Sequence, residues 1–156
     1  MITKKQLLNK KYNSYSFLNE EEEDVEKTSD KNEGETNNGD FAEMMSLLFH
    51  SRTQTHTLHL QTESFAEHMA LNGFYDGIID LADSLAETWM GRKEEKIGDI
   101  PVINPPKGNP LAVMKRLLTV VQDTRDFCSD DTVLSNIIDE IEALYSSTIY
   151  KLKFLK

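Results

Sequence analysis

The stretch TQTHTLHLQTESFAEHMALNGFYDGIIDLADSLAETWMG, residues 53–91, decides how the rest of the chain is interpreted. From His68 onward, polar residues recur at steps of three and four, and apolar residues recur in a second register of the same period. This spacing predicts one helix with separate polar and apolar faces. The polar face holds Asn72, Asp76, Asp80, Asp83 and Glu87, and the apolar face holds Leu71, Phe74, Ile78, Leu81 and Leu85.

Turn and cap signals bound this helix and predict another one before it. Thr62 and Ser64 are candidate N-caps, so we expect a helix over Ser64–Met90 with Gly91 as its C-cap. We expect the preceding helix to begin at Asp40, because Glu43 follows three residues later and approximates a capping box.

Two glycines, Gly73 and Gly77, interrupt the predicted polar helix. A glycine inside a helix costs up to about 1 kcal/mol relative to alanine. Small residues four positions apart let another backbone come close. The spacing therefore predicts that a neighbouring helix or a second subunit packs against this part of the helix.

The second half of the chain predicts two more helices after a long connection. Residues 92–109, RKEEKIGDIPVINPPKGN, contain three prolines and two glycines. Pro110 suits the first turn of a third helix, and apolar residues recur at helical spacing over Asp131–Leu152, the fourth. Little in the chain alternates as a strand would. The sequence therefore predicts an all-α four-helix bundle with a long connection between helices two and three.

Length and composition predict a single folded domain after an N-terminal tail. The chain has 156 residues and a formal net charge of −10, which disfavours nucleic acid and anionic membranes as partners of the whole protein. Residues 1–39 are basic and then acidic, and after Leu18 they hold almost no large apolar residue. We expect this tail to be disordered and residues 40–156 to form the bundle.

The start of the tail is a candidate DNA-binding arm, because lysines alternate there with aromatic residues. A mobile terminus is the simpler interpretation. The acidic run that follows competes with phosphate for the same charges, which ranks DNA last among the expected partners. The lysines concerned are Lys4, Lys5, Lys10 and Lys11.

The cellular setting is expected to be the cytoplasm. Cys128 is the single cysteine, which excludes an internal disulfide and suits a reducing compartment. No apolar run approaches the roughly eighteen residues that a membrane span needs, so we expect no membrane partner.

The run HLQTESFAEHMALNGFYDGIIDLADSLAE, residues 59–87, resembles the signature region of the Dps proteins, the ferritin-like mini-ferritins. The elements that carry the resemblance are His59, Phe65, His68 and the pair Asp83 and Glu87. The chain is most similar to the shortened Dps-like proteins of phage genomes. The resemblance implies a ferritin-like bundle, and for a phage protein it implies the cytoplasm of the host cell.

The resemblance also implies an inter-subunit metal site. In this family two histidines and a third group come from one subunit, and an Asp and a Glu come from its two-fold mate. By that likeness His59 and His68 face Asp83 and Glu87 of a partner, and Asn72 stands where the family has a carboxylate. His56 remains an alternative first ligand, because it precedes His68 by the family's usual separation. Leu60 replaces the family's usual tryptophan.

The family's chemistry is ferroxidase activity. Its members oxidise Fe(II), chiefly with hydrogen peroxide, store Fe(III) inside a dodecameric shell and thereby limit oxidative damage. Imidazole and carboxylate ligands suit iron, zinc or manganese. The resemblance thus implies an iron-binding homo-oligomer, a dimer or a dodecameric shell. Two alternatives stay open: a ferritin-like structural or binding protein that has lost catalysis, and a DNA-binding protein acting through the tail lysines.

Overall fold

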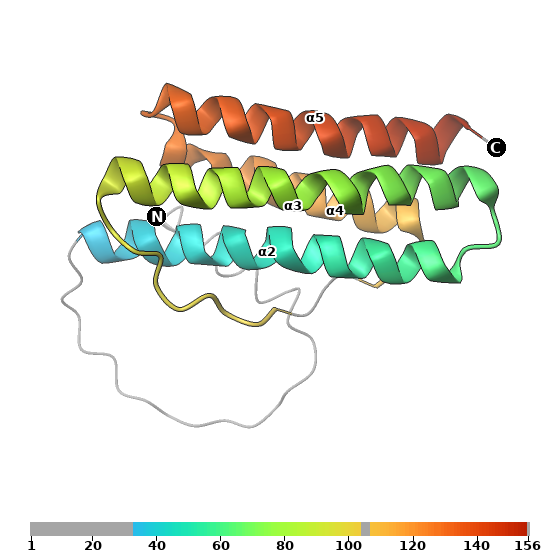
Figure 1. The fold of residues 1–156 in the computed structure, drawn as a ribbon, viewed down its shortest axis with the longest axis horizontal. Coiled ribbons are helices and arrows are strands. Elements are labelled where there is room, and N and C mark those ends of the chain that lie inside the picture. Colours follow the sequence, from blue (N-terminus) through green and yellow to red (C-terminus); the bar gives the residue numbers. More distant parts are fainter. Residues whose placement is uncertain (1–32, 104–106, 156) are drawn as a thin grey trace, which may run out of the picture.

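The fold is known from a computed structural model that describes residues 33–103 and 107–155. In these two segments the chain forms helices and no strand, so the predicted all-α class is confirmed (Figure 1). The elements are α2 (Glu33–Gln61), α3 (Phe65–Lys93), α4 (Pro110–Thr124), the 3₁₀ helix η1 (Arg125–Cys128) and α5 (Thr132–Phe154). None of these helices is long and apolar enough to cross a membrane.

The four α-helices pack side by side, and each has two neighbours. α2 contacts α3 and α4, while α5 contacts α3 and α4 from the other side. α3 runs opposite to α2, α4 runs in the same direction as α3, and α5 returns in the direction of α2 (Figure 1). Two antiparallel helix pairs, α2–α3 and α4–α5, thus form the bundle.

The long connection between α3 and α4 follows α2 along its length, which lets α4 begin at the opposite end of the bundle (Figure 1). Near its start the Gly98 amide donates to Asn38 Oδ1 at 2.8 Å, and Asn38 Nδ2 donates to the carbonyl of Lys96 at 3.0 Å. Further on, the Ser46 hydroxyl donates to the carbonyl of Pro101. These bonds fix the connection to α2.

Polar side chains begin three of the helices. Ser64 caps α3 by accepting from the Glu67 amide, Asn109 caps α4 by accepting from the Ala112 amide, and Asp131 caps α5. Each cap satisfies a backbone amide that has no partner inside its helix. The predicted starts of these three helices are therefore confirmed.

Three predicted helix limits differ from the structure, and the smallest difference is at the end of α5, which lies at Phe154 and not at Leu152. α2 begins at Glu33 and not at Asp40, so its first turns lie in the segment expected to be disordered; the bonds from Asn38 to the connection provide tertiary support there. α3 continues through Gly91 to Lys93, and its C-cap is Glu94 in the left-handed conformation (φ 53°).

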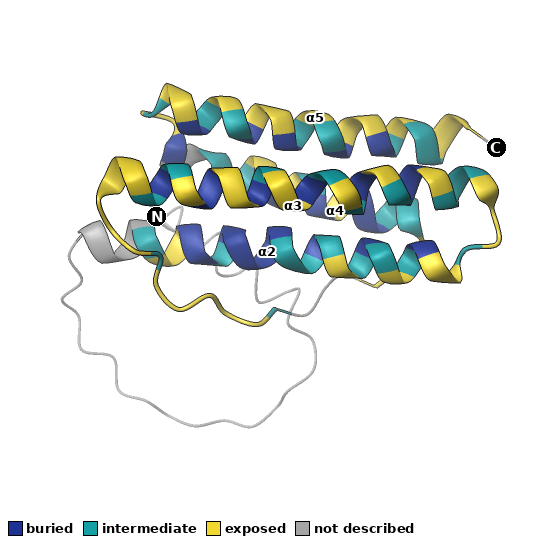
Figure 2. Ribbon diagram, in the orientation of Figure 1, coloured by how far each residue is buried: buried dark blue, intermediate teal, exposed yellow. Residues whose placement is uncertain are grey.

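The core fills the space between the four helices (Figure 2). On α3 the buried set includes four of the five predicted apolar positions, and the fifth, Leu81, is half-buried and packs against the core. Ring contacts tie α3 to both neighbours: Trp89 stacks on Phe41 of α2 with centroids 4.5 Å apart, and Phe74 meets Tyr145 of α5 at 4.7 Å. α3 is thus the central helix of the core.

The two glycines of α3 behave differently. A Cβ added to Gly77 would lie 3.3 Å from Leu144 Cδ2, so this glycine lets α5 pack closely. A Cβ on Gly73 would meet nothing within 4 Å. The predicted close approach of a neighbouring helix is confirmed at Gly77.

Shortening a side chain at the centre of this core should destabilise the bundle. Ile138 is 0% exposed, and truncation of such a residue leaves a cavity. We expect Ile138→Ala to lower the free energy of unfolding by about 2–5 kcal/mol. Val102→Ala is the control, because Val102 is 90% exposed and such substitutions change stability by about 0.5 kcal/mol or less. Urea unfolding measures both, and equal effects would contradict this packing.

The ion pair that joins α3 to α5 should make stability depend on pH. Arg92 donates to the Asp131 carboxylate, and this bond, helped by the Leu134 and Val133 amides, lowers the pKa of Asp131. Its contribution is complete above the unfolded-state pKa of about 3.9 and is lost as pH falls through the lower folded-state value.

Urea unfolding from pH 7 to pH 2 tests this ion pair. Arg92→Gln should destabilise the chain above pH 5, and its difference from wild type should shrink in acid. Arg116→Gln is the matched control, because Arg116 donates to a backbone carbonyl, that of Lys107. A constant difference between Arg92→Gln and wild type at every pH would contradict the assignment.

Candidate metal centre

The turn between α2 and α3 brings His59 and His68 together. The turn is short because Ser64 caps α3 directly after α2 ends. It is held by Thr62, whose hydroxyl donates to Glu67 Oε2 at 2.6 Å and also accepts from the Ser64 amide at 3.1 Å. The last turn of α2 and the first turn of α3 therefore lie face to face.

The two histidines are locked to each other's backbone. His59 Nδ1 lies 3.0 Å from the carbonyl oxygen of His68, and His68 Nδ1 lies 3.2 Å from the carbonyl oxygen of His59. The rings stack with centroids 3.6 Å apart and planes 28° from parallel. Each histidine thus fixes the position of the other.

This pairing decides which ring nitrogen can bind a ligand. A carbonyl oxygen only accepts hydrogen bonds, so Nδ1 of both residues carries the proton. In the neutral ring Nε2 then keeps the lone pair, which is the arrangement that a metal-binding histidine needs. Neither Nε2 is among the buried polar atoms that lack a partner, and neither forms a hydrogen bond within the described residues. Both Nε2 atoms therefore remain without a hydrogen-bond partner among the described residues.

A cluster of polar and aromatic side chains, centred on Tyr75, lies next to the histidine pair along α3. Tyr75 stacks on His56 with centroids 4.3 Å apart and meets His59 edge-on at 5.2 Å. The Tyr75 hydroxyl donates to Asn72 Oδ1 at 2.9 Å, and Asn72 Nδ2 donates to Asp76 Oδ2 at 2.7 Å. Asn72, the predicted third ligand, therefore has its only ligating atom in a hydrogen bond with Tyr75.

Of the two candidate first ligands, the structure pairs His59 with His68. His59 is 7% exposed and stacks directly on His68, whereas the His56 ring is 5.9 Å from the His59 ring and lies against Tyr75. The geometry therefore favours His59 over His56 as the partner of His68.

The predicted carboxylate ligands lie far from the histidines of the same chain. At about 1.5 Å per residue, Asp83 is about 22 Å and Glu87 about 28 Å beyond His68 along α3. Both carboxylates are exposed. Among the described residues no group of three or more His, Cys, Asp or Glu side chains comes together as a metal site. One chain therefore assembles the histidine pair without its carboxylates.

Comparison with known proteins gives the chain a family. A family profile matches residues 59–152, which is more than half of the chain. The chain belongs to DUF5856, a family of unknown function. The DUF5856 match begins at His59 and covers His68, Asn72, Asp83 and Glu87, whereas His56 and the tail lie outside it. No match was found among curated proteins or solved structures.

Tyr75 is the site residue that sequence reasoning missed. The sequence analysis gave it no role, yet it contacts His56, His59 and Asn72. Its spacing could have indicated this role, because Tyr75 lies seven residues after His68 and three after Asn72, which places all three on the same side of a helix.

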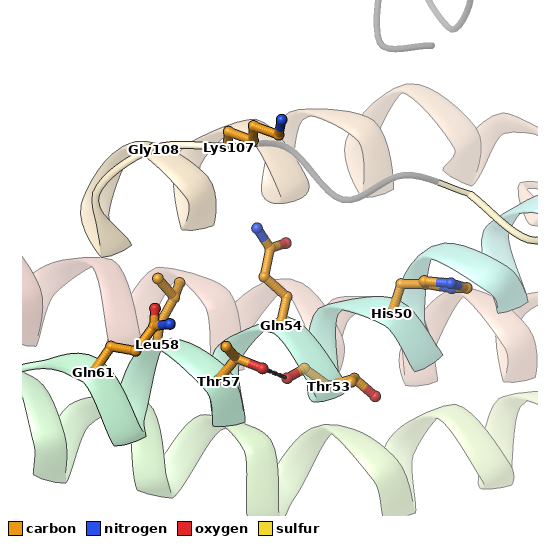
Figure 3. Close-up of a pocket in the computed structure, with 8 residues that line it drawn as sticks. All are labelled: His50, Thr53, Gln54, Thr57, Leu58, Gln61, Lys107 and Gly108. Atoms are coloured by element: carbon orange, nitrogen blue, oxygen red, sulfur yellow. Dashed lines mark hydrogen bonds between the residues drawn. The ribbon is translucent and has the colours of Figure 1, made fainter. Parts of the chain in front are cut away.

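A surface pocket of about 340 Å³ lies elsewhere, between α2 and the start of α4 (Figure 3). It is lined by His50, Thr53, Gln54, Thr57, Leu58, Gln61, Lys107 and Gly108. It contains none of the predicted metal ligands. The candidate DNA-binding lysines, Lys4, Lys5, Lys10 and Lys11, lie outside the described residues.

The histidine tautomers test this geometry directly. We expect long-range ¹H–¹⁵N NMR spectra of the metal-free protein to show His59 and His68 protonated at Nδ1, with Nε2 as the bare nitrogen. His56 is the internal comparison, because it has no ring-nitrogen hydrogen bond among the described residues and should average both tautomers. An Nε2–H tautomer at His59 or His68 would contradict the reciprocal pairing.

Proposed function

We propose that this DUF5856 protein is a ferritin-like, Dps-type iron protein that oxidises Fe(II) with hydrogen peroxide at a site shared between two chains. The topology supports the fold: two antiparallel helix pairs joined by one long crossover are the arrangement of ferritin-like bundles. Here the crossover runs along α2 from one end to the other. The fold alone does not imply an activity, so the argument for function rests on the site.

The histidine pair is the observation that carries the proposal. His59 and His68 hold each other in the tautomer that leaves Nε2 available. A metal ion needs further ligands, and the nearest candidates in the sequence motif, Asp83 and Glu87, are more than 20 Å away along the same helix by its rise of about 1.5 Å per residue. Only a second chain can place those carboxylates beside the pair.

The exposed face of α3 supports an antiparallel pairing of two chains. Its first half carries Phe65 and Met69, which are 79% and 52% exposed, beside the histidine pair. Its second half carries the exposed acidic residues Asp80, Asp83 and Glu87 before the basic last turn formed by Arg92 and Lys93. A two-fold contact is self-complementary by symmetry, so it would set the histidine half of each helix against the acidic half of the other.

The proposed site binds one Fe(II) as substrate. Two imidazoles and two carboxylates suit Fe(II), with zinc or manganese as competing metals, and leave positions for an oxidant. Asn72 Oδ1 accepts from Tyr75 and keeps a second lone pair, so it stays a candidate neutral ligand. The chain's own residues bind and orient iron: the backbone carbonyls fix both rings, and the partner's carboxylates balance the cation's charge. The Fe(III) product would be stored within the assembled shell, which would limit oxidative damage.

Mixing two inactive variants tests the shared site. We expect His68→Ala and Asp83→Ala each to abolish peroxide-dependent Fe(II) oxidation. Loss of a direct ligand should weaken metal binding by more than the about 10–100-fold typical of second-shell partners. A heterodimer of the two variants has one doubly damaged site and one intact site. Co-expressed chains should therefore recover activity that neither variant has.

The control for this experiment is Glu140→Ala, which removes an exposed carboxylate on α5 and should oxidise Fe(II) as wild type does. Light scattering of every sample gives the oligomeric state. Failure of the mixed chains to recover activity, with dimers present, would count decisively against a site shared between chains.

A second candidate function follows from Asn72. In this chain the position holds a neutral amide that is occupied by Tyr75 and Asp76. A ferritin-like bundle that assembles but has lost catalysis would keep the oligomer and show no peroxide-dependent Fe(II) oxidation. DNA binding through the tail lysines is ranked last, and deletion of residues 1–18 is its test.

A further inference from the structure

The outer face shared by α3 and α5, called the α3–α5 face below, carries negative charge that no basic residue balances. A Cβ on Gly77 would lie 3.3 Å from Leu144, so the two helices meet there. Asp80 follows Gly77 by three residues and Glu140 precedes Leu144 by four, which places both on this side of their helices. Both are exposed, and neither forms an ion pair with a described residue. The sequence has no lysine or arginine over residues 65–91 or 132–150.

The arginines nearest to this face already have partners. Arg92 pairs with Asp131 at one edge of the face. Arg125 lies 2.7 Å from Asp139 and 2.8 Å from Glu142, and it reaches both from the end of α4. Neither guanidinium is therefore available to Asp80 or Glu140, and the negative charge of the face remains unbalanced by the bundle itself.

The same face also offers apolar contact. Val133 is 43% exposed, and Leu81 and Leu144 are half-buried where they pack against the core. A Cβ on Gly73 would meet nothing within 4 Å, so the surface is open at that point. A segment lying along this face can thus bury apolar side chains and pair positive charges at once.

The first 18 residues of the chain match the face in both respects. They contain four lysines and no acidic residue. Their large apolar side chains are Leu7, Leu8, Tyr12, Tyr15, Phe17 and Leu18. We propose that residues 1–18 dock on the α3–α5 face of their own chain. This docking goes beyond the iron chemistry proposed above and does not depend on it, because His68 lies beside α2, on the other side of α3.

The intervening chain is long enough for this contact. α2 begins at Glu33, at the end of the bundle where α3 finishes and α5 starts (Figure 1). Asp80 lies about 20 Å before the end of α3, at about 1.5 Å per residue. Residues 19–32 span up to about 46 Å when extended. The lysines can therefore reach Asp80 and Glu140 from the same chain.

The acidic run at residues 20–26 is the main competitor for the lysines, because it is closer to them in sequence. It offers six carboxylates but a single apolar side chain, Val25. The aromatic residues of the tail gain little from such a run, whereas the α3–α5 face offers apolar surface together with charge. This difference favours the face over the run as the docking site.

Carbodiimide cross-linking of the full chain tests the docking, because this reagent joins a lysine amine to a carboxylate that it touches. ¹⁴N- and ¹⁵N-labelled chains are unfolded and refolded together, so that mass spectrometry separates links within a chain from links between chains. We expect the lysines of residues 1–18 to link to Asp80 and Glu140 within one chain. Weaker links should form to Asp76 and Glu87, which are exposed on the same helix as Asp80.

A double variant shows whether the charges of the face hold the tail. In Asp80→Asn/Glu140→Gln the remaining links to Asp76 and Glu87 should fall by at least about twofold, since two surface ion pairs are lost. The matched control is Glu63→Gln/Asp99→Asn, which removes the same charge from two exposed positions off the face and should leave those links unchanged.

Three results would overturn the docking. The first is tail links confined to residues 20–26 or spread equally over the exposed carboxylates of the bundle. The second is an equal loss of links in the two double variants. The third is links that join ¹⁴N to ¹⁵N chains in place of links within one chain, which would assign the face to the tail of a second copy. None of these measurements uses iron, so failure of the proposed function would leave this test unaffected.

Discussion

The packing of α3 between α2 and α5 is the constraint on which the rest of the structure depends. One side of α3 buries Phe74 and Trp89 against both neighbours, and Gly77 lets α5 approach closely. Once that side is committed to the core, the opposite side of the helix must face outward. The exposed carboxylates of α3 and the position of His68 beside α2 are consequences of the same rotation of one helix about its axis.

The fold could be predicted largely from the sequence because its signals are local. Helical spacing identified the apolar stripe of α3, and the caps Ser64 and Asp131 mark where helices begin. The start of α2 could not be found in this way. The segment around Asn38 is polar and favours disorder, and its helix is supported by bonds to Lys96 and Gly98, which are distant in sequence. Tertiary contacts of this kind leave no local pattern.

The residue types of the candidate site could be predicted from the sequence, but the hydrogen bonds and ring contacts between them could not. The family resemblance placed His59 with His68, and the family's usual separation from His68 kept His56 as an alternative. The pairing of His59 with His68 follows from reciprocal bonds to backbone carbonyls, which depend on the geometry of the turn. The sequence presents Asn72 only as a neutral residue where the family has a carboxylate. The structure adds that its Oδ1 accepts a hydrogen bond from the Tyr75 hydroxyl, a contact that the sequence does not show.

The burial of Cys128 bears on how this chain would withstand an oxidant. Cys128 is the single cysteine of the sequence, and burial raises the pKa of its thiol to about 11. The thiolate is the form that reacts with oxidants and binds soft metals, so at neutral pH this sulfur stays protonated and inert. The thiol is thereby protected from sulfenic acid formation and from cross-linking to other chains. Burial in the bundle interior therefore limits the reactivity of the Cys128 thiol as well as stabilising the fold.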